Sequence, residues 1–116
     1  MAKTPYLLQT GMGVDLHGGD DTTAACRAVT HAIHRNSLLF LREVGLHSAE
    51  QIHVDVTIAC PHPERVDTDA VAASLPVGVV SVDAQPGGML AETGTEGDEA
   101  LIAIAAVRVS VALSSA

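Results

Sequence analysis

Aromatic side chains are almost absent from this chain, which has no Trp, one Tyr and one Phe in 116 residues. Its apolar fraction is an ordinary 47%, so the core must be built mainly from Ala, Val, Leu and Ile. Small side chains leave each pair of packed elements little area to bury. Burial between subunits would compensate, and we therefore expect a homo-oligomer.

Positive charge is also scarce. Six Lys and Arg residues stand against fourteen Asp and Glu residues, which gives a formal net charge of −8. The few cations form no cluster, and a phosphate backbone would be repelled, so nucleic acid is not an expected partner. An acidic balance of this kind indicates by itself no more than good solubility.

Cysteines and long apolar runs are few. Cys26 and Cys60 are too few for a disulfide framework. The longest apolar run, over residues 100–107, is too short to span a bilayer, so no membrane partner is expected. The first residues lack the apolar core and cleavage site of a secretion signal. These absences together predict a cytoplasmic protein.

Hydrophobic periodicity predicts four strands and two helices. Strands are expected over residues 6–17, 51–60, 77–84 and 101–113, where apolar residues alternate or run continuously. Helices are expected over residues 22–36, after Asp20 and Asp21, and from Asp67 or Thr68 to about Leu75. Residues 38–44 either continue the first helix or form a separate turn, residues 85–88 form a turn, and residues 92–99 form a polar, mobile loop.

The predicted order β-α-β-α-β-β indicates a single α+β domain over residues 1–116, with a mixed sheet and both helices on one face. The helical connection between the first two strands favours a common direction and a right-handed crossover. The uncovered face is expected to be the polar one, facing solvent or another subunit. We assign to it Gln9, Asp15, His17, His53, Asp55, Thr57 and Arg108.

Chemistry is expected at the carboxyl ends of the parallel strands, because ligands favour that edge of a sheet. The topology brings residues 14–21 and 60–65 together there. Asp15 and His17 are two residues apart on one strand, so their side chains point the same way. A carboxylate beside an imidazole can fix its tautomer and raise its basicity, which makes a general base. The same two side chains could equally cap the strand end by bonding to loop amides.

Several neighbouring residues are weaker candidates. Gly18 and Gly19 permit close approach of a ligand, and the amides of the following helix start could hold an anion, although a plain turn is the simpler interpretation. Cys60 could be a nucleophile activated by His62 or His17, but its parity puts it on the core side and favours a buried thiol. His62, held between two prolines, is a candidate ligand contact.

Asp15, His17 and His62 would suit a divalent metal ion, but no metal-binding spacing supports such a site, and no metal or other cofactor is expected. Arg108 is the only positive charge within a predicted strand. A buried arginine needs a carboxylate, which Asp15, Asp55 or a ligand could supply.

The order of short motifs resembles an uncharacterised family of small bacterial and archaeal proteins. The resemblance rests on Gly11-Met12-Gly13-Val14-Asp15-Leu16-His17-Gly18, on Asp20 or Asp21 before an alanine-rich helix, on Pro61-x-Pro63-Glu64-x-Val66-Asp67, and on Gly87-Gly88. It covers most of the chain and implies only that Asp15, His17, Gly18 and Gly88 are candidate site residues.

Two more distant similarities concern the architecture. The layout resembles the fold of the trimeric α+β chorismate mutases and YjgF-like proteins, and residues 51–61 look like one repeat of the ring-opening cyclic amide hydrolases. Both resemblances imply ligand sites between like domains around a threefold axis. The serine–lysine pair of the amide hydrolases has no counterpart here, since Lys3 is the only lysine. Arginines suited to a dicarboxylate substrate are also scarce.

The leading hypothesis is a homo-oligomeric enzyme, expected to be a trimer, acting on a small polar metabolite at an inter-subunit site by hydrolysis or proton transfer. His17 would be the general acid–base and Asp15 would orient it. The expected ligand contacts are Gly18, Gly19, His62, Arg65, Gly87, Gly88 and Arg108.

Two other classes of function stay open. The chain could be a ligand-binding or regulatory module without turnover, which needs the same pocket and no base. It could also be a structural assembly subunit, in which Asp15, His17 and Arg108 form an ion network between copies.

Overall fold

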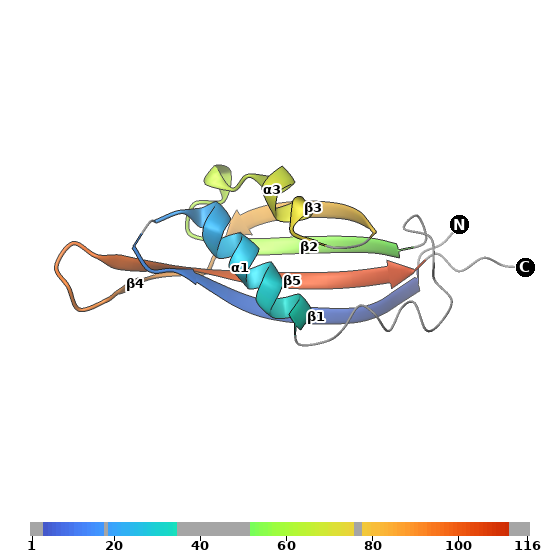
Figure 1. Ribbon diagram of the computed structural model, residues 1–116, viewed down its shortest axis with the longest axis horizontal. Helices are drawn as coiled ribbons and strands as arrows, with labels where there is room; N and C mark the ends of the chain where they lie inside the picture. Colours follow the sequence, from blue (N-terminus) through green and yellow to red (C-terminus); the bar gives the residue numbers. More distant parts are fainter. Residues whose placement is uncertain (1–3, 18, 35–51, 76–77, 112–116) are drawn as a thin grey trace, which may run out of the picture.

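The computed structural model describes residues 4–17, 19–34, 52–75 and 78–111 (Figure 1). The five strands are β1 (Thr4–Asp15), β2 (Ile52–Cys60), β3 (Val79–Pro86), β4 (Met89–Glu92) and β5 (Glu99–Val111). The helices within these ranges are α1 (Asp21–His34), the 3-10 helix η2 (Pro63–Arg65) and α3 (Thr68–Ala73). The segment 38–44 lies outside the described residues. None of the described helices has the length and apolar character needed to cross a membrane.

The sheet is mixed, as the sequence predicted, and its strand order is β1-β5-β2-β3. Strand β5 is antiparallel to both β1 and β2, while β2 and β3 are parallel. The strands β1 and β2 therefore run in the same direction with β5 between them. Their carboxyl ends lie at one edge of the sheet, where the chemistry was expected.

Among the strands, β4 is the one that the sequence did not predict. It pairs with β5 just beyond the point where β2 ends. The last β2 residue paired with β5 is Ala59, which lies opposite Ile104. Two residues earlier on β5, Ile102 lies opposite Met89 of β4. The polar segment expected to be a mobile loop is thus the tip of a hairpin between β4 and β5. This hairpin projects beyond the rest of the sheet in Figure 1.

Helix α1 packs on the face of β1 that carries its glycines. A Cβ atom at Gly11 would lie 2.3 Å from the carbonyl oxygen of Ala28, and one at Gly13 would lie 2.1 Å from that of Ala24. The helix backbone can approach this closely only because neither glycine has a side chain. The bare face of β1 is therefore the covered face.

Two residues assigned to the uncovered face lie on the helix side instead. Gln9 is 5% exposed and pairs in register with the buried Val107, and Asp15 pairs with the buried Leu101. The assignment was wrong because it took the apolar residues of β1 as the core set. The close approach of α1 reverses that choice.

The core lies between the helices and one face of the sheet (Figure 1). Along β2 every second residue is buried, and α3 contributes Val71. Alanines of α1 and β5 fill much of the layer, in agreement with the small-residue composition. The fully buried aliphatic residues include Ala24, Ala28, Val29, Ala32, Val54, Ile58, Ala103, Ala105, Val107 and Val109.

The opposite face of the sheet, called the open face below, carries no helix among the described residues. Its side chains alternate with the core set along each strand. By register they are Leu8, Thr10, Met12 and Val14 of β1, Ile102, Ile104, Ala106, Arg108 and Ser110 of β5, His53, Asp55, Thr57 and Ala59 of β2, and Val79, Ser81, Asp83 and Gln85 of β3. Of these, Ser110 is buried.

Candidate acid–base site

A carboxylate and an imidazole form a close pair where the carboxyl end of β2 meets the start of α1. The side chain of Asp21 is 0% exposed, and its Oδ1 lies 3.1 Å from Nδ1 of His62. Its Oδ2 accepts a hydrogen bond from the backbone N–H of His62 at 2.9 Å. The imidazole is 32% exposed. One end of the ring is thus fixed against a buried charge, while part of the ring remains in contact with solvent.

The start of α1 is held in place by local hydrogen bonds. Asp20 caps the helix: its Oδ1 accepts from the backbone N–H groups of Thr22 and Thr23 at 2.9 and 3.3 Å. Hydrogen bonding to the Thr23 hydroxyl is the main reason that the pKa of Asp20 is lowered. The Thr22 hydroxyl donates to the carbonyl of Arg65 and accepts from the backbone N–H of Asp67. These links fix the helix start against the segment that follows β2.

Cys60 lies beneath the pair as a buried thiol. It is 0% exposed, and burial raises its pKa to about 11, helped by the charge of Asp21 and by a hydrogen bond to that carboxylate. A thiol with this pKa is neutral near pH 7 and is a poor nucleophile. The sequence favoured a buried structural thiol, and its burial is confirmed.

The contact with Asp21 favours one neutral tautomer of the His62 ring. A ring that donates from Nδ1 to this carboxylate leaves Nε2 as its basic nitrogen. No described residue gives Nε2 a hydrogen-bond partner. The pair therefore has the arrangement that a general acid–base requires.

His17 has a carboxylate partner, but it is not Asp15. Its Nδ1 lies 3.3 Å from Oδ1 of Asp98, at the tip of the β4–β5 hairpin. The side chain of His17 is 76% exposed and that of Asp98 is 24% exposed. Hydrogen bonds from the Thr93 hydroxyl and then from His17 lower the pKa of Asp98. This second pair lies at the surface and ties the hairpin to the loop after β1.

Asp15 has a structural contact instead of the expected one. Its Oδ2 accepts the backbone N–H of Asp20 at 2.9 Å, and its Oδ1 lies 3.7 Å from a guanidinium nitrogen of Arg27. The side chains of Asp15 and His17 do not hydrogen-bond to each other, because the chain leaves the strand after Asp15 and parity no longer applies. Asp15 closes the turn between β1 and α1, which is the capping role that the sequence left open.

The glycines after His17 make no site contact that the structure describes. Gly18 lies outside the described residues. Gly19 has φ +61°, and nothing lies within 4 Å of the place where its Cβ would be. The amides at the helix start are already used, since the Asp20 carboxylate accepts from two of them. An anion site at the start of α1 is thus occupied by the protein's own cap.

Gly87 and Gly88 lie where the chain crosses the end of β2 on its way from β3 to β4. Gly87 donates its N–H to the carbonyl of Cys60 at 3.0 Å. A Cβ at Gly88 would lie 2.1 Å from the carbonyl oxygen of Ile102, and its φ is +65°. The two glycines therefore allow a close backbone crossing at the same edge as His62, and their contacts are with the protein itself.

The two arginines proposed as ligand contacts lie in different places. Arg65 is exposed in η2, on the same edge as His62. Arg108 lies on the open face, where its guanidinium is 3.5 Å from Oδ2 of Asp55. Of the two carboxylates that the sequence offered to Arg108, Asp55 is the partner. Arg108 is therefore on the opposite side of the sheet from the covered face that holds Asp21.

The residues considered for a metal do not come together as ligands. Within the part of the chain that the structure describes, no group of three or more His, Cys, Asp and Glu side chains is placed to hold a metal ion. Asp15 is engaged by Asp20 and Arg27, and His62 by Asp21. The donor set of Asp15, His17 and His62 is not assembled among these residues.

A scan against family models matches residues 5–109 to the conserved hypothetical protein family Lin0512_fam. The match covers nearly the whole chain. The protein belongs to the Lin0512 family. This agrees with the expectation of an uncharacterised family.

One solved structure is similar to this Lin0512 protein over almost its full length. It is described as an FtsZ-like protein of unknown function from Nostoc punctiforme PCC 73102. The two chains are 38% identical, the TM-score is 0.84, and the similarity covers 97% of this chain and 99% of that one. A comparison with curated proteins found no match. The relatives support the fold and assign no activity.

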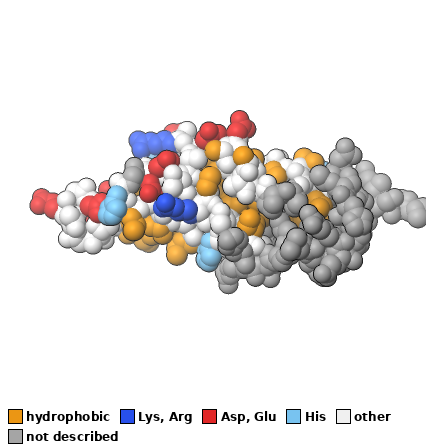
Figure 2. Space-filling model, in the orientation of Figure 1, with side chains coloured by type: hydrophobic (Ala, Val, Ile, Leu, Met, Phe, Trp, Pro, Cys, Tyr) orange, Lys and Arg blue, Asp and Glu red, His pale blue; other side chains and the backbone are white. Residues whose placement is uncertain are grey.

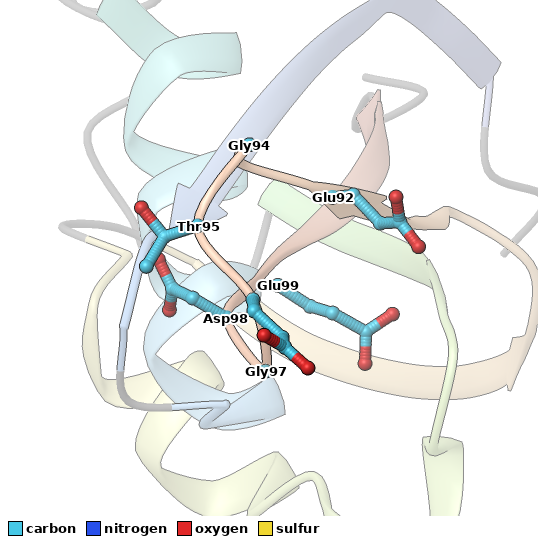
Figure 3. A pocket seen from close by; sticks show the side chains of 7 residues that line it. Glu92, Gly94, Thr95, Gly97, Asp98 and Glu99 are labelled. Atoms are coloured by element: carbon cyan, nitrogen blue, oxygen red, sulfur yellow. The ribbon is translucent and has the colours of Figure 1, made fainter.

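The hairpin tip of the Lin0512 chain borders an open hollow of about 550 Å³, lined by residues of the hairpin itself (Figure 3). Figure 3 shows the carboxylates of Glu92 and Glu99 pointing to one side of the tip, and Asp98 and Thr95 lying on the other. Glu92 and Glu99 are directly opposite in register. Like charges at such a position repel. The hollow is open and acidic, and it is separate from the pair of Asp21 and His62.

Sequence reasoning missed two carboxylates. The sequence analysis treated Asp21 only as a residue that favours a helix start. The expectation that residues 14–21 and 60–65 meet at the carboxyl edge of the sheet already brought it near His62. Asp98 was assigned to a mobile loop, and it contacts His17 across 81 positions in the chain. No local pattern predicts such a contact. Acidic side chains are spread along this side of the molecule, from the hairpin tip to the region of α3 (Figure 2).

Proposed function

We propose that this protein is a small-molecule enzyme that uses His62 as its general acid–base and Asp21 as the carboxylate that orients it. The observation that carries the proposal is the 3.1 Å contact between Nδ1 of a partly exposed imidazole and a carboxylate that is fully buried. A buried charge held by one ring nitrogen supports proton transfer at the other.

We assign the acid–base role to His62, whereas the sequence alone favoured His17. Both imidazoles have a carboxylate partner, but Asp98 is partly exposed and His17 is largely exposed. Solvent and salt weaken a surface pair of this kind. Asp21 is buried and accepts two hydrogen bonds from His62 alone, so the orientation of that ring is better defined.

Hydrolysis of a small cyclic amide is the reaction class that we favour. Nε2 of His62 takes a proton from a water molecule while the water oxygen bonds to the amide carbon. The ring C–N bond then breaks, and the leaving nitrogen receives that proton from the imidazolium. The reaction needs no oxidant, reductant or organic cofactor, and proton transfer within one small metabolite is the related alternative.

The charge around the pair favours a neutral or cationic substrate. The chain carries a net charge of −8, and exposed acidic residues surround the pair, among them Asp20, Glu64 and Asp67. An anionic substrate would be repelled, whereas Arg65 on the same edge can donate hydrogen bonds to an amide oxygen. We place the enzyme in a homo-oligomer, for which the chorismate-mutase-like resemblance implies a trimer; Asp21 and His62 belong to one chain, so the acid–base pair itself needs no residue from a neighbouring copy.

The test is a turnover assay on a panel of five- and six-membered cyclic amides and imides, followed by mass spectrometry of the ring-opened products. For a substrate that the wild type opens, we expect His62→Gln to lower kcat by roughly 10²- to 10⁴-fold, the usual contribution of a general acid–base. His53→Gln is the matched control, because His53 lies at the opposite end of β2 and on the open face.

His17→Gln separates the two Asp–His pairs. If His17→Gln abolishes turnover and His62→Gln keeps it, the pair at the surface is the acid–base and our assignment is wrong. Circular dichroism of each variant shows whether the fold is retained, so that loss of turnover through unfolding is recognised.

One observation favours a second function, a ligand-binding module without turnover. Asp21 also accepts the backbone N–H of His62, so it joins α1 to the end of β2 whatever the imidazole does. Under this alternative a ligand retained by the purified protein is recovered chemically unchanged after long incubation, with wild type and His62→Gln alike.

A further inference from the structure

The open face carries apolar side chains that a solvated sheet face does not need. Leu8 is 66% exposed, Met12 53%, Ile104 47%, Val79 51% and Met89 58%. They come from four different strands, β1, β5, β3 and β4. By register Met12 and Ile104 are direct neighbours, and Met89 lies next to Ile102. Met12, Ile104, Ile102 and Met89 thus form one contiguous group, while Leu8 lies four residues away on β1 beside Arg108, and Val79 lies on the edge strand β3. Scattered apolar residues are normal on a surface, but a contiguous group on one sheet face marks an interaction site.

We infer that the open face of the sheet is the interface between copies of this chain. The four strands β1, β5, β2 and β3 form a face about 30 Å long and about 19 Å wide, from the usual rise per residue and strand spacing. Two such faces packed together bury on the order of 1,100 Å² or more. A specific protein interface needs about 1,000 Å², so one sheet face is large enough.

The charges on the open face suit a second copy better than an unrelated partner. Arg108 of β5 and Asp55 of β2 lie opposite each other on the two central strands, 58% and 38% exposed. Each copy thus offers one cation and one anion on its two central strands, and Asp83 adds a second anion on the edge strand β3. A second copy can present Asp55 to Arg108 of the first, which a wholly apolar or singly charged surface cannot do.

The composition of the core also favours an interface on the open face. On the helix side the core is built largely of alanine and valine. Such a layer contributes less burial per residue than one of leucine and phenylalanine. Covering the open face would remove Leu8, Met12 and Ile104 from water and add the apolar burial that the core lacks. This inference does not depend on the chemistry of Asp21 and His62.

The experiment is native mass spectrometry and sedimentation velocity of the full chain, for the wild type and for Leu8→Glu and Met12→Glu. We expect a wild-type oligomer of one size at about 10 µM, and a shift of each variant to monomer because a charge is buried in the interface. Leu8 is the most exposed of the set, so Leu8→Glu should leave the fold of the monomer intact. Leu90→Glu is the matched control, since Leu90 is 43% exposed but pairs with the buried Leu101 and so lies on the other face.

A wild-type monomer at 100 µM overturns the inference. So does an oligomer that survives both Leu8→Glu and Met12→Glu with its size unchanged, because the copies would then meet elsewhere. Loss of the oligomer in these two variants, with Leu90→Glu unaffected, supports the open face. None of these results depends on turnover, so failure of the interface and failure of the proposed enzyme activity are read separately.

Discussion

At the residue scale, Asp21 is the side chain that interacts with both His62 and Cys60. It is buried at the first position of α1, and it accepts hydrogen bonds from the backbone and the ring of His62. A buried carboxylate is costly unless it is hydrogen-bonded, and these bonds offset that cost. The same bonds fix the ring of His62. One side chain therefore stabilises the edge of the sheet and, under the proposed function, orients the imidazole for proton transfer.

The thiol of Cys60 gives a prediction about stability and pH. Its pKa is about 11 in the folded chain and 9.0 in an ordinary cysteine. A group whose pKa is raised by folding contributes stability below its unfolded pKa and loses it as the pH rises through the folded pKa. We expect the free energy of unfolding to fall by about 2 kcal/mol between pH 9 and pH 11 because of this thiol.

Urea unfolding at pH 8, 9, 10 and 11 measures this effect, with Cys60→Ala as the control. The variant should lose distinctly less stability over this range than the wild type, because Cys26 and the other titrating groups are common to both. Equal losses in the two proteins would mean that Cys60 is not held as a neutral thiol next to Asp21.

At the scale of elements, the contact of α1 with β1 depends on bare backbone. A Cβ at Gly13 would lie 2.1 Å from the carbonyl oxygen of Ala24 and 2.3 Å from the backbone nitrogen of Ala28. Neither atom can move without moving the helix. Since the first residue of α1 is Asp21, the distance between helix and strand also sets where the acid–base pair lies.

Replacing one of these glycines should therefore be severe. We expect Gly13→Ala to lower the free energy of unfolding by at least about 3 kcal/mol, because the added methyl group forces the helix away from the sheet. Gly19→Ala is the matched control: Gly19 has φ +61° with nothing within 4 Å, so only the backbone conformation opposes the change, at about 1 kcal/mol. Similar losses for the two variants in urea unfolding would contradict the close packing of α1 on β1.

Some of the strands and helices could be predicted from the sequence, and others could not. The boundaries of β2 and α1 were predicted to within two residues wherever the structure describes them, because burial alternates along β2 and Asp20 is a strong cap. The covered face of β1 was predicted wrongly, since periodicity shows which residues share a face and not which face a helix covers. Strand β4 was missed because four residues carry too short a pattern.

The candidate site was predicted only in part. The edge rule correctly joined the start of α1 to the end of β2, and His62 was named as a ligand contact. The pairing of Asp15 with His17 was wrong, because the turn after Asp15 ends the strand geometry on which it relied. The pair of Asp21 and His62 depends on tertiary packing across 41 positions, which no local pattern encodes.

At the scale of the whole molecule, the sheet separates two surfaces with different proposed roles. Its helix side and carboxyl edge hold the pair of Asp21 and His62, and its open face holds the exposed apolar residues with Arg108 and Asp55. An interface on the open face leaves the edge with His62 accessible to substrate. The two proposals are therefore compatible, and each can fail without the other.

The central claim is that Asp21 holds His62 with its basic nitrogen free. The most direct test is a long-range ¹H–¹⁵N spectrum of protein labelled with ¹⁵N at histidine, recorded for the wild type and Asp21→Asn at a pH where His62 is neutral. We predict that the His62 ring carries its proton on Nδ1 in the wild type, and that this tautomer loses its dominance in Asp21→Asn. A wild-type ring protonated on Nε2, or the same tautomer in both proteins, would contradict the claim.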